Sequence, residues 1–160
     1  TAGLSSIINA LEQYKEKFGE YPEAVNPGTT GSGSASSLFT GGALMLYQAV
    51  TGDGYDNIKD ADKASPLGSP ASDGEVDANE RANSIRGDLP KTMILYTASG
   101  YMLIDGFGRP YQYEKGGSEY AVNATFDVWS FAQAKNPPSV RLTGGTKKDD
   151  KLTAVWIKNW

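Results

Sequence analysis

Cysteine and histidine are both absent from this chain of 160 residues. Their absence excludes disulfide bonds, zinc sites with thiolate or imidazole ligands, cysteine nucleophiles and Ser-His-Asp triads. The sequence also has no run approaching the ~20 apolar residues that span a bilayer, and it shows no signal peptide. We therefore expect the chain as given to be soluble.

Basic residues are too few and too scattered for a nucleic-acid-binding face. Lys and Arg number 15 against 19 Asp and Glu, which gives a formal charge of −4, and no basic run is interleaved with aromatics. The one basic cluster is Lys147-Lys148, with Lys151 and Lys158 nearby, and the two aspartates after Lys148 neutralise most of it. This pattern predicts a solvated surface.

The beginning of the chain has the pattern of an amphipathic helix over residues 2–18. Apolar residues recur there at spacings of three and four: Leu4, Ile7, Ile8, Leu11, Tyr14 and Phe18. Gly19 is a suitable C-terminal cap, and Tyr21-Pro22 continues as extended chain. Because the pattern is already in phase at Leu4 without a convincing N-cap, we expect the chain to start inside a longer helix.

The middle of the sequence is rich in Gly, Ser and Asp. Residues 26–37 form a Gly/Ser/Thr loop that lacks GxGxxG and a following Lys-Ser/Thr, so a phosphate cradle is not expected. A second helix is predicted over 37–50 with Gly52 as its stop, although Gly41-Gly42 weakens it. Residues 53–88 are predicted to form a long connecting segment with short turns.

Short β-type runs dominate the last third of the chain. They are 93–96, 101–104, 111–113, 121–122, 126–129 and 154–157. Their spacing predicts antiparallel strands joined by hairpins, with one longer loop over 135–150. The predicted fold is α+β, one domain over 1–160: a helix at 1–19 packed on an antiparallel meander at 91–160, with a long variable helical and loop insert at 25–90.

Acidic residues are the only candidates for catalysis or metal binding. Asp105, Glu114 and Asp127 lie among the predicted strands and could supply the carboxylate pair of a hydrolase. Each also has a structural interpretation: Asp105 precedes Gly106 in a tight turn, Glu114 alternates outward beside Tyr113, and Asp127 flanks Trp129. The structural interpretation is favoured, and we predict no catalytic residues.

Calcium is the cofactor that the acidic residues suit best, because hard cations need several oxygen ligands. Two groups qualify, although neither matches the EF-hand pattern, and for the first a solvated acidic loop is favoured. The first group is Asp53, Asp56, Asn57, Asp60 and Asp62, and the second is Asp149 with Asp150. Among the aromatics, Trp160 stands out because a terminal aromatic is ordered only if it docks.

Five segments carry a resemblance to a known family. They are IINALEQYKEKFGEYPEA at 7–24, LMLYQAVTGDG at 44–54, LIDGFGRPYQYEKGG at 103–117, FDVWSFA at 126–132 and WIKNW at 156–160. In this order they resemble the pseudopilins, in particular the major pseudopilin of type II secretion and its prepilin-type relatives. The family patterns are AL-x-x-Y-x-x-x-x-G-x-YP, D-P/G-[FW]-G-x-P-Y-x-Y, [FY]DLWS and I-x-NW.

The resemblance implies a type IV pilin-like fold and a structural, non-enzymatic role in protein export. An upstream hydrophobic helix, cleaved and methylated by a prepilin peptidase, would anchor the protein in the bacterial inner membrane with its head in the periplasm. The partners implied are further copies in a helical pseudopilus, other pseudopilins and inner-membrane secretion components. The alternative is a minor pilin-like head that binds secreted substrate or surface glycan through residues 25–90, and a carboxylate hydrolase is a weaker one.

The chain departs from the family pattern in two places. Residues 25–90 are longer than the corresponding region of the usual major pseudopilin. The family's calcium site is implied to lie between WS-x-G-x-DG and D-x-D-I-x-NW, but residues 131–135 lack the first aspartate and Asp149-Asp150 is separated from Trp156 by an insertion. The metal ligands carried over are therefore only Asp149 and Asp150. We therefore expect no cofactor. The Lys-rich loop is a candidate to replace the calcium ion of the family pattern.

Overall fold

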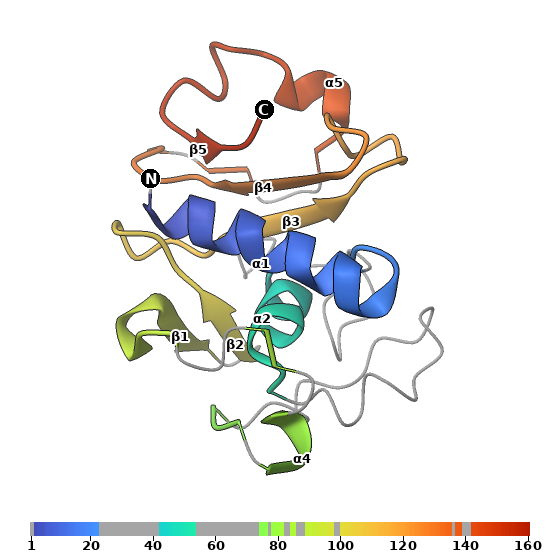
Figure 1. Ribbon diagram of the computed structural model, residues 1–160. Helices are drawn as coiled ribbons and strands as arrows, with labels where there is room; N and C mark the ends of the chain where they lie inside the picture. Colours follow the sequence, from blue (N-terminus) through green and yellow to red (C-terminus); the bar gives the residue numbers. More distant parts are fainter. Residues whose placement is uncertain are drawn as a thin grey trace.

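The computed structural model combines helices with two antiparallel sheets, which is compatible with the predicted α+β class (Figure 1). It describes residues 2–22, 42–53, 74–76, 78–81, 84–85, 89–97, 100–135, 137–138 and 142–160. The helices are α1 (Ala2–Phe18), α2 (Ala43–Thr51), α4 (Ala78–Arg81) and α5 (Gly144–Lys147), with a 3-10 turn at Lys91–Met93. The strands are β1 (Ile94–Thr97), β2 (Gly100–Leu103), β3 (Gln112–Lys115), β4 (Phe126–Ser130) and β5 (Ile157–Lys158).

Helix α1 confirms the predicted amphipathic helix. Its apolar stripe is buried in the main core, with Leu4, Ile7 and Leu11 packed among residues of the strands. Gly19 ends the helix in a left-handed conformation, and its N–H donates to the Lys15 carbonyl. None of the helices within the described ranges is both long and apolar enough to cross a membrane.

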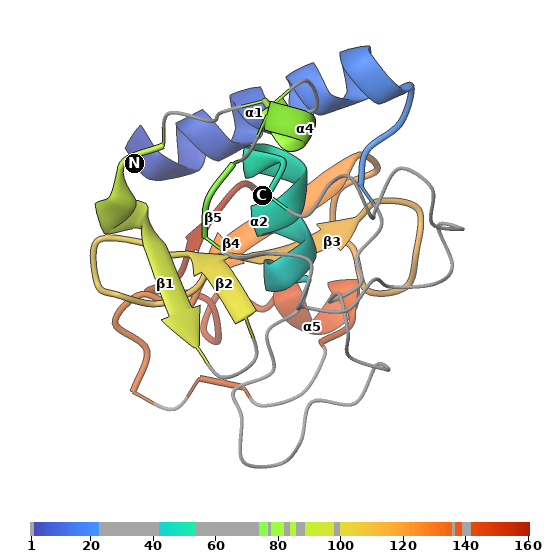
Figure 2. The same cartoon turned by 90° about the horizontal axis from the view of Figure 1, so that it is seen from below.

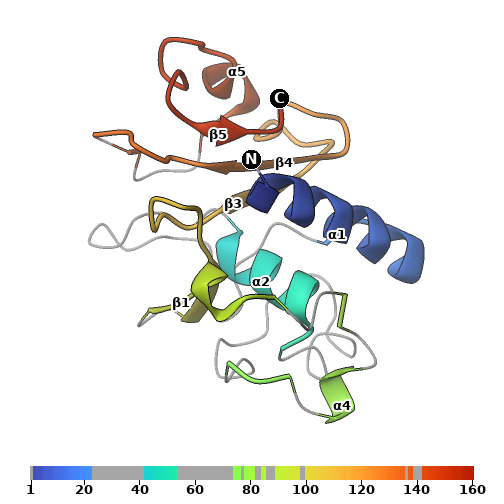
Figure 3. The same cartoon turned by 60° about the vertical axis from the view of Figure 1, so that its left-hand side comes forward.

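Helix α2 begins later than predicted, directly after Gly42. That glycine has φ 73° and precedes the helix, so it does not interrupt the helix interior as the sequence suggested. Gly52 ends α2 in the left-handed region, as predicted. The helix lies beside α1, on the side away from β4 (Figures 1 and 3), and packs against β2, where Tyr47 stacks on Tyr101. Residues 37–41 of the predicted helix lie outside the described part of the chain.

Gly42→Ala is expected to lower the free energy of unfolding by at least about 2 kcal/mol. An alanine pays a steric penalty in the left-handed region, and its Cβ would lie 2.5 Å from the Tyr113 carbonyl oxygen, a backbone atom that cannot rotate away. Gly19→Ala is the matched control, since Gly19 has a positive φ but nothing within 4 Å of the added Cβ. Urea denaturation of the two variants measures the difference, and equal losses would show that the contact with Tyr113 is not tight.

The predicted meander is divided into two sheets. Strands β1 and β2 form a two-stranded antiparallel sheet, and β3, β4 and β5 form a second sheet in that order. In the described residues, the expected strand at 121–122 is absent, and the run predicted at 154–157 is replaced by the two-residue strand β5, which pairs with β4. In Figure 2, α2 lies in front of the region between β2 and β3, and α1 runs along the upper edge of the view.

Strand β4 is buried on both sides, and its alternate residues belong to different layers. Phe126 and Val128 join the main core beneath α1, whereas Trp129 joins an aromatic cluster with Phe131 and Trp156. The C-terminal segment, including α5, lies on the side of β4 opposite α1 (Figures 1 and 3). We call the side of the β3–β4–β5 sheet that carries Asp127 and Trp129 the outer face.

Asp53 joins the parts of the chain on either side of residues 54–73, which lie outside the described part. Asp53 accepts from the Tyr47 hydroxyl at 2.7 Å and from the Gly74 N–H at 2.8 Å. Burial, and then the hydrogen bond to Asp53, raises the pKa of Tyr47 above its usual value of 10.0, so the phenol remains a neutral donor. Asp53 is therefore a buried structural residue, and not the solvated side chain expected from the sequence.

Candidate functional site

The outer face of the sheet holds an unusual set of buried charged residues. Register pairs Glu114 with Asp127 and Gln112 with Trp129 across β3 and β4, so these four side chains share one face. All four are at most 3 % exposed. The C-terminal segment covers this outer face, and the side chains between the sheet and that segment form a second buried layer of the domain.

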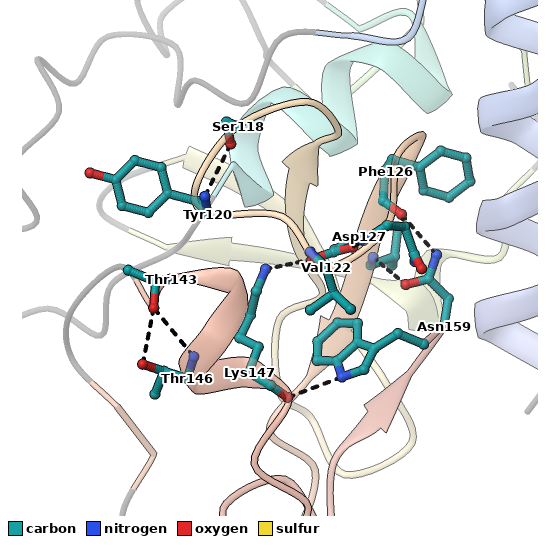
Figure 4. A network of polar contacts seen from close by, with 12 residues as sticks. Ser118, Tyr120, Val122, Phe126, Asp127, Thr143, Thr146, Lys147 and Asn159 are labelled. Atoms are coloured by element: carbon teal, nitrogen blue, oxygen red, sulfur yellow. Dashed lines mark hydrogen bonds and ion pairs between the residues drawn. The ribbon is translucent and has the colours of Figure 1, made fainter.

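An ion pair lies at the centre of this layer. The Lys147 ammonium, at the end of α5, lies 2.6 Å from Asp127 Oδ2, and both side chains are fully buried (Figure 4). Asp127 also accepts backbone N–H bonds from Val122 at 2.7 Å and from Asn123 at 2.9 Å. The carboxylate thus has three donors, which compensate for the water that it loses on burial.

Two indole rings complete the surroundings of the Lys147 ammonium. Its Nζ lies 4.2 Å from the centre of the Trp129 ring and 5.3 Å from that of Trp160, within the range of cation–π attraction. The Trp160 indole N–H donates to the Lys147 carbonyl at 3.1 Å. The expected docking of the terminal aromatic is confirmed, and its partner is the helix that carries the buried lysine.

The prediction of a solvated basic cluster is therefore wrong for Lys147. Lys148 and Lys151 are exposed, as expected, and Lys158 is half-buried and donates to the Thr153 hydroxyl at 2.6 Å. The local sequence Lys-Lys-Asp-Asp has the composition of a surface loop, and no local pattern distinguishes Lys147 from Lys148. Only the placement of α5 over β4 selects the first of the two lysines.

The three carboxylates singled out in the sequence occupy different environments. Asp105 forms the predicted turn, since its Oδ1 accepts from the N–H groups of Phe107 at 2.8 Å and Arg109 at 2.9 Å, and its other oxygen accepts from Ser130. Glu114 does not point outward to solvent, because the outer face is covered. The structure brings Glu114 and Asp127 together as cross-strand neighbours and leaves Asp105 in the separate turn.

Hydrolysis by the Glu114 and Asp127 pair does not fit this geometry. Asp127 is 0 % exposed and already holds the Lys147 ammonium, so a substrate has no access to its carboxylate. A glycosidase needs both carboxyl groups to face the bond that is cleaved. The arrangement suits a structural role for both acids.

The two possible calcium ligands carried over from the family pattern do not belong to a larger acidic group in the described residues. Asp149 and Asp150 are exposed, and Asp149 Oδ1 accepts from the Lys151 N–H at 3.0 Å within its own turn. In the described part of the chain, no group of three or more potential acidic ligands is close enough to hold a metal ion. Of the first acidic group, Asp56, Asn57, Asp60 and Asp62 lie outside the described residues.

A largely apolar groove of about 670 Å³ opens near the start of α1. It is bordered by Gly3, Met93, Phe107 and Ile157, and Phe107 is 55 % exposed. The charged group on its lining is Asp105, whose oxygens are held by the turn and by Ser130. The groove therefore offers shape and apolar surface, without a group positioned for chemistry.

Comparison of the chain with protein-family models, with curated proteins and with solved structures finds no match.

Proposed function

We propose that this chain is the globular head of a pseudopilin-like protein with a type IV pilin-like fold. Its role would be structural: a subunit of a type II secretion pseudopilus, or of a related pilus-like fibre, that takes part in protein export by polymerising. A hydrophobic helix upstream of α1 would anchor it in the bacterial inner membrane, with the head in the periplasm. Assembly of the fibre would push folded substrates outward.

The observation that carries this proposal is that the resembling segments bond to one another. The Tyr113 hydroxyl, from the Gly-rich turn segment, donates to the Pro22 carbonyl of the YP motif at 2.6 Å. Asn159, from the closing NW motif, accepts from the Val128 N–H at 3.0 Å and donates to the Phe126 carbonyl at 3.1 Å. Four of the five segments are thus hydrogen-bonded in pairs, which is consistent with a shared fold.

The backbone at Ala132 gives independent support. It is the only residue other than glycine with a positive φ in the described part of the chain, with φ 46°. In the family pattern WS-x-G-x-DG, the position corresponding to Ala132 is a glycine. A conformation that favours glycine therefore occurs where the pattern calls for one, although this chain has alanine.

Helix α1 has a polar face available for contacts between subunits. Its apolar stripe is buried in the core, whereas Gln13 and Glu16 are exposed. If the fibre is built on a helix that continues α1 upstream, this exposed face lies nearest the neighbouring subunits. A change of charge on the exposed face of α1 would then affect fibre assembly more than a change of charge on surface turns away from this helix.

Glu16→Lys in the full-length gene product is expected to reduce fibre assembly about tenfold, which corresponds to ~1.4 kcal/mol per subunit contact. The melting temperature of the head should be unchanged, since Glu16 is exposed. Glu119→Lys is the matched control, because Glu119 is also exposed and accepts the Gly144 N–H through its backbone carbonyl, which the substitution retains. Quantifying the protein in sheared fibres from the native host measures the effect.

Two results would contradict the proposed function. One is a full-length gene product whose mature N-terminus carries no hydrophobic, methylated helix in mass spectrometry. The other is a deletion strain that exports its periplasmic cargo normally and a wild-type strain whose sheared fraction lacks this protein. A monomeric protein that captures cargo or glycan would instead indicate the binding-head alternative.

A further inference from the structure

The fully buried ammonium of Lys147 is the feature that the proposed fibre role leaves unexplained. Lysine is almost never completely buried unless it is paired, and burying two ions usually stabilises a fold less than apolar side chains of the same volume would. Lys147 and Asp127 are nevertheless both 0 % exposed and 2.6 Å apart. A gain in stability alone therefore does not explain the pair.

The charges around Lys147 indicate what its positive charge contributes. Asp127 and its cross-strand neighbour Glu114 place two carboxylates on the covered outer face. Burying a carboxylate without a nearby cation is strongly unfavourable. Closure of the C-terminal segment over this face is therefore much more favourable when a cation is enclosed with it.

The surroundings of the ammonium are built as a cage for one cation. The carboxylate of Asp127 lies on one side, and the rings of Trp129 and Trp160 approach within 4.2 and 5.3 Å. Trp160 also donates to the Lys147 carbonyl, so the lysine and the terminal residue hold each other in place. The cage joins β4, α5 and the end of the chain at one point.

From these contacts we propose that Lys147 is the built-in cation of the outer face and takes the place of a bound metal ion. Its ammonium holds residues 142–160 against β4, and this layer folds without calcium. The cage selects a primary ammonium, which offers a compact charge and N–H donors to the carboxylate. This inference concerns the head alone and does not depend on fibre assembly.

Thermal unfolding of the 160-residue chain tests the proposal. With EGTA and with 5 mM calcium, the wild-type melting temperature should agree within about 1 °C, since a ligand that does not bind the native state cannot stabilise it. Lys147→Ala should melt roughly 10 °C lower. Lys148→Ala is the matched control, because Lys148 is exposed, and it should melt with the wild type.

Chemical rescue then probes the cage directly. Adding n-butylammonium or n-propylammonium at tens of millimolar should raise the melting temperature of Lys147→Ala by several degrees. A ligand that binds the native state stabilises it by RT ln(1 + [L]/Kd). Tetramethylammonium at the same ionic strength lacks N–H donors and should return less. None of the three ammonium ions should alter the melting temperature of the wild type or of Lys148→Ala.

The proposal would be overturned by a calcium-dependent rise of more than about 2 °C in the wild type, by a Lys147→Ala variant as stable as the wild type, or by equal effects of all the ammonium ions. If Lys147→Ala does not fold, the paired variant Asp127→Asn/Lys147→Met replaces it. That pair lacks both charges and should be more stable than Lys147→Met alone. A pair no more stable than the single variant would also overturn the proposal.

Discussion

Lys147→Met is expected to lower the free energy of unfolding by about 3–5 kcal/mol, the usual cost of leaving one partner of a buried ion pair without the other. Methionine is an unbranched, flexible side chain that fills much of the same space, so the loss reports charge more than volume. Asp127 keeps its two backbone N–H donors and loses its counter-ion. Urea denaturation followed by tryptophan fluorescence measures the change, because Trp129 and Trp160 lie next to the ammonium.

The salt dependence of this variant separates a buried pair from a surface one. Screening weakens interactions between exposed charges, whereas buried pairs are screened much less. The difference between wild type and Lys147→Met should therefore persist at 1 M NaCl. Lys148→Met provides the control and should change the free energy by less than ~0.5 kcal/mol, since Lys148 is exposed. A difference that disappears in salt would place Lys147 at the surface.

Asp105→Ala is expected to cost about 3 kcal/mol, because it removes the acceptor of three hydrogen bonds at once. The N–H groups of Phe107 and Arg109 and the hydroxyl of Ser130 all donate to this carboxylate, and each contributes roughly 1 kcal/mol net. The turn between β2 and β3 and its connection to β4 are held by the same side chain. Equilibrium urea unfolding measures the loss.

Two further variants make the Asp105 prediction specific. Asp105→Asn retains one carbonyl acceptor and should lose less than Asp105→Ala. Asp150→Ala removes an exposed carboxylate and should be nearly neutral. If Asp105→Ala is as stable as Asp150→Ala, the turn is held by its backbone bonds, such as that from the Gly108 N–H to the Asp105 carbonyl, and the side chain is dispensable.

The sequence predicts correctly those elements that depend on residues close to one another in the chain. The period of the apolar residues in α1 and the glycines at 19 and 52 depend on neighbours within a few residues, so the helix and both stops agree with the structure. The antiparallel pairing of β1 with β2 follows from two short runs and a turn in the same way, whereas β3 pairs directly with β4 without the expected strand at 121–122 between them. The tight turn at Asp105 is likewise a local feature.

Features that depend on what covers a surface could not be predicted. Glu114 was expected to face solvent because strand residues alternate, but alternation indicates exposure only when one face of the sheet is open. Here the C-terminal segment covers the second face, so Phe126 through Ser130 are all buried. The expected strand at 121–122 is replaced by a turn, and the N–H groups of Val122 and Asn123 in this turn donate to the Asp127 carboxylate.

The sequence by itself determined the class of fold, the limits of α1, the end of α2, and the absence of chemistry that needs cysteine or histidine. It also placed the Asp105 turn, since each of these depends on residue type and short-range spacing. The tertiary structure alone decided that Lys147 is buried and Lys148 exposed. Adjacent lysines in a charged loop are equivalent until α5 docks on β4, where Asp127 and two indole rings offer a place for one ammonium.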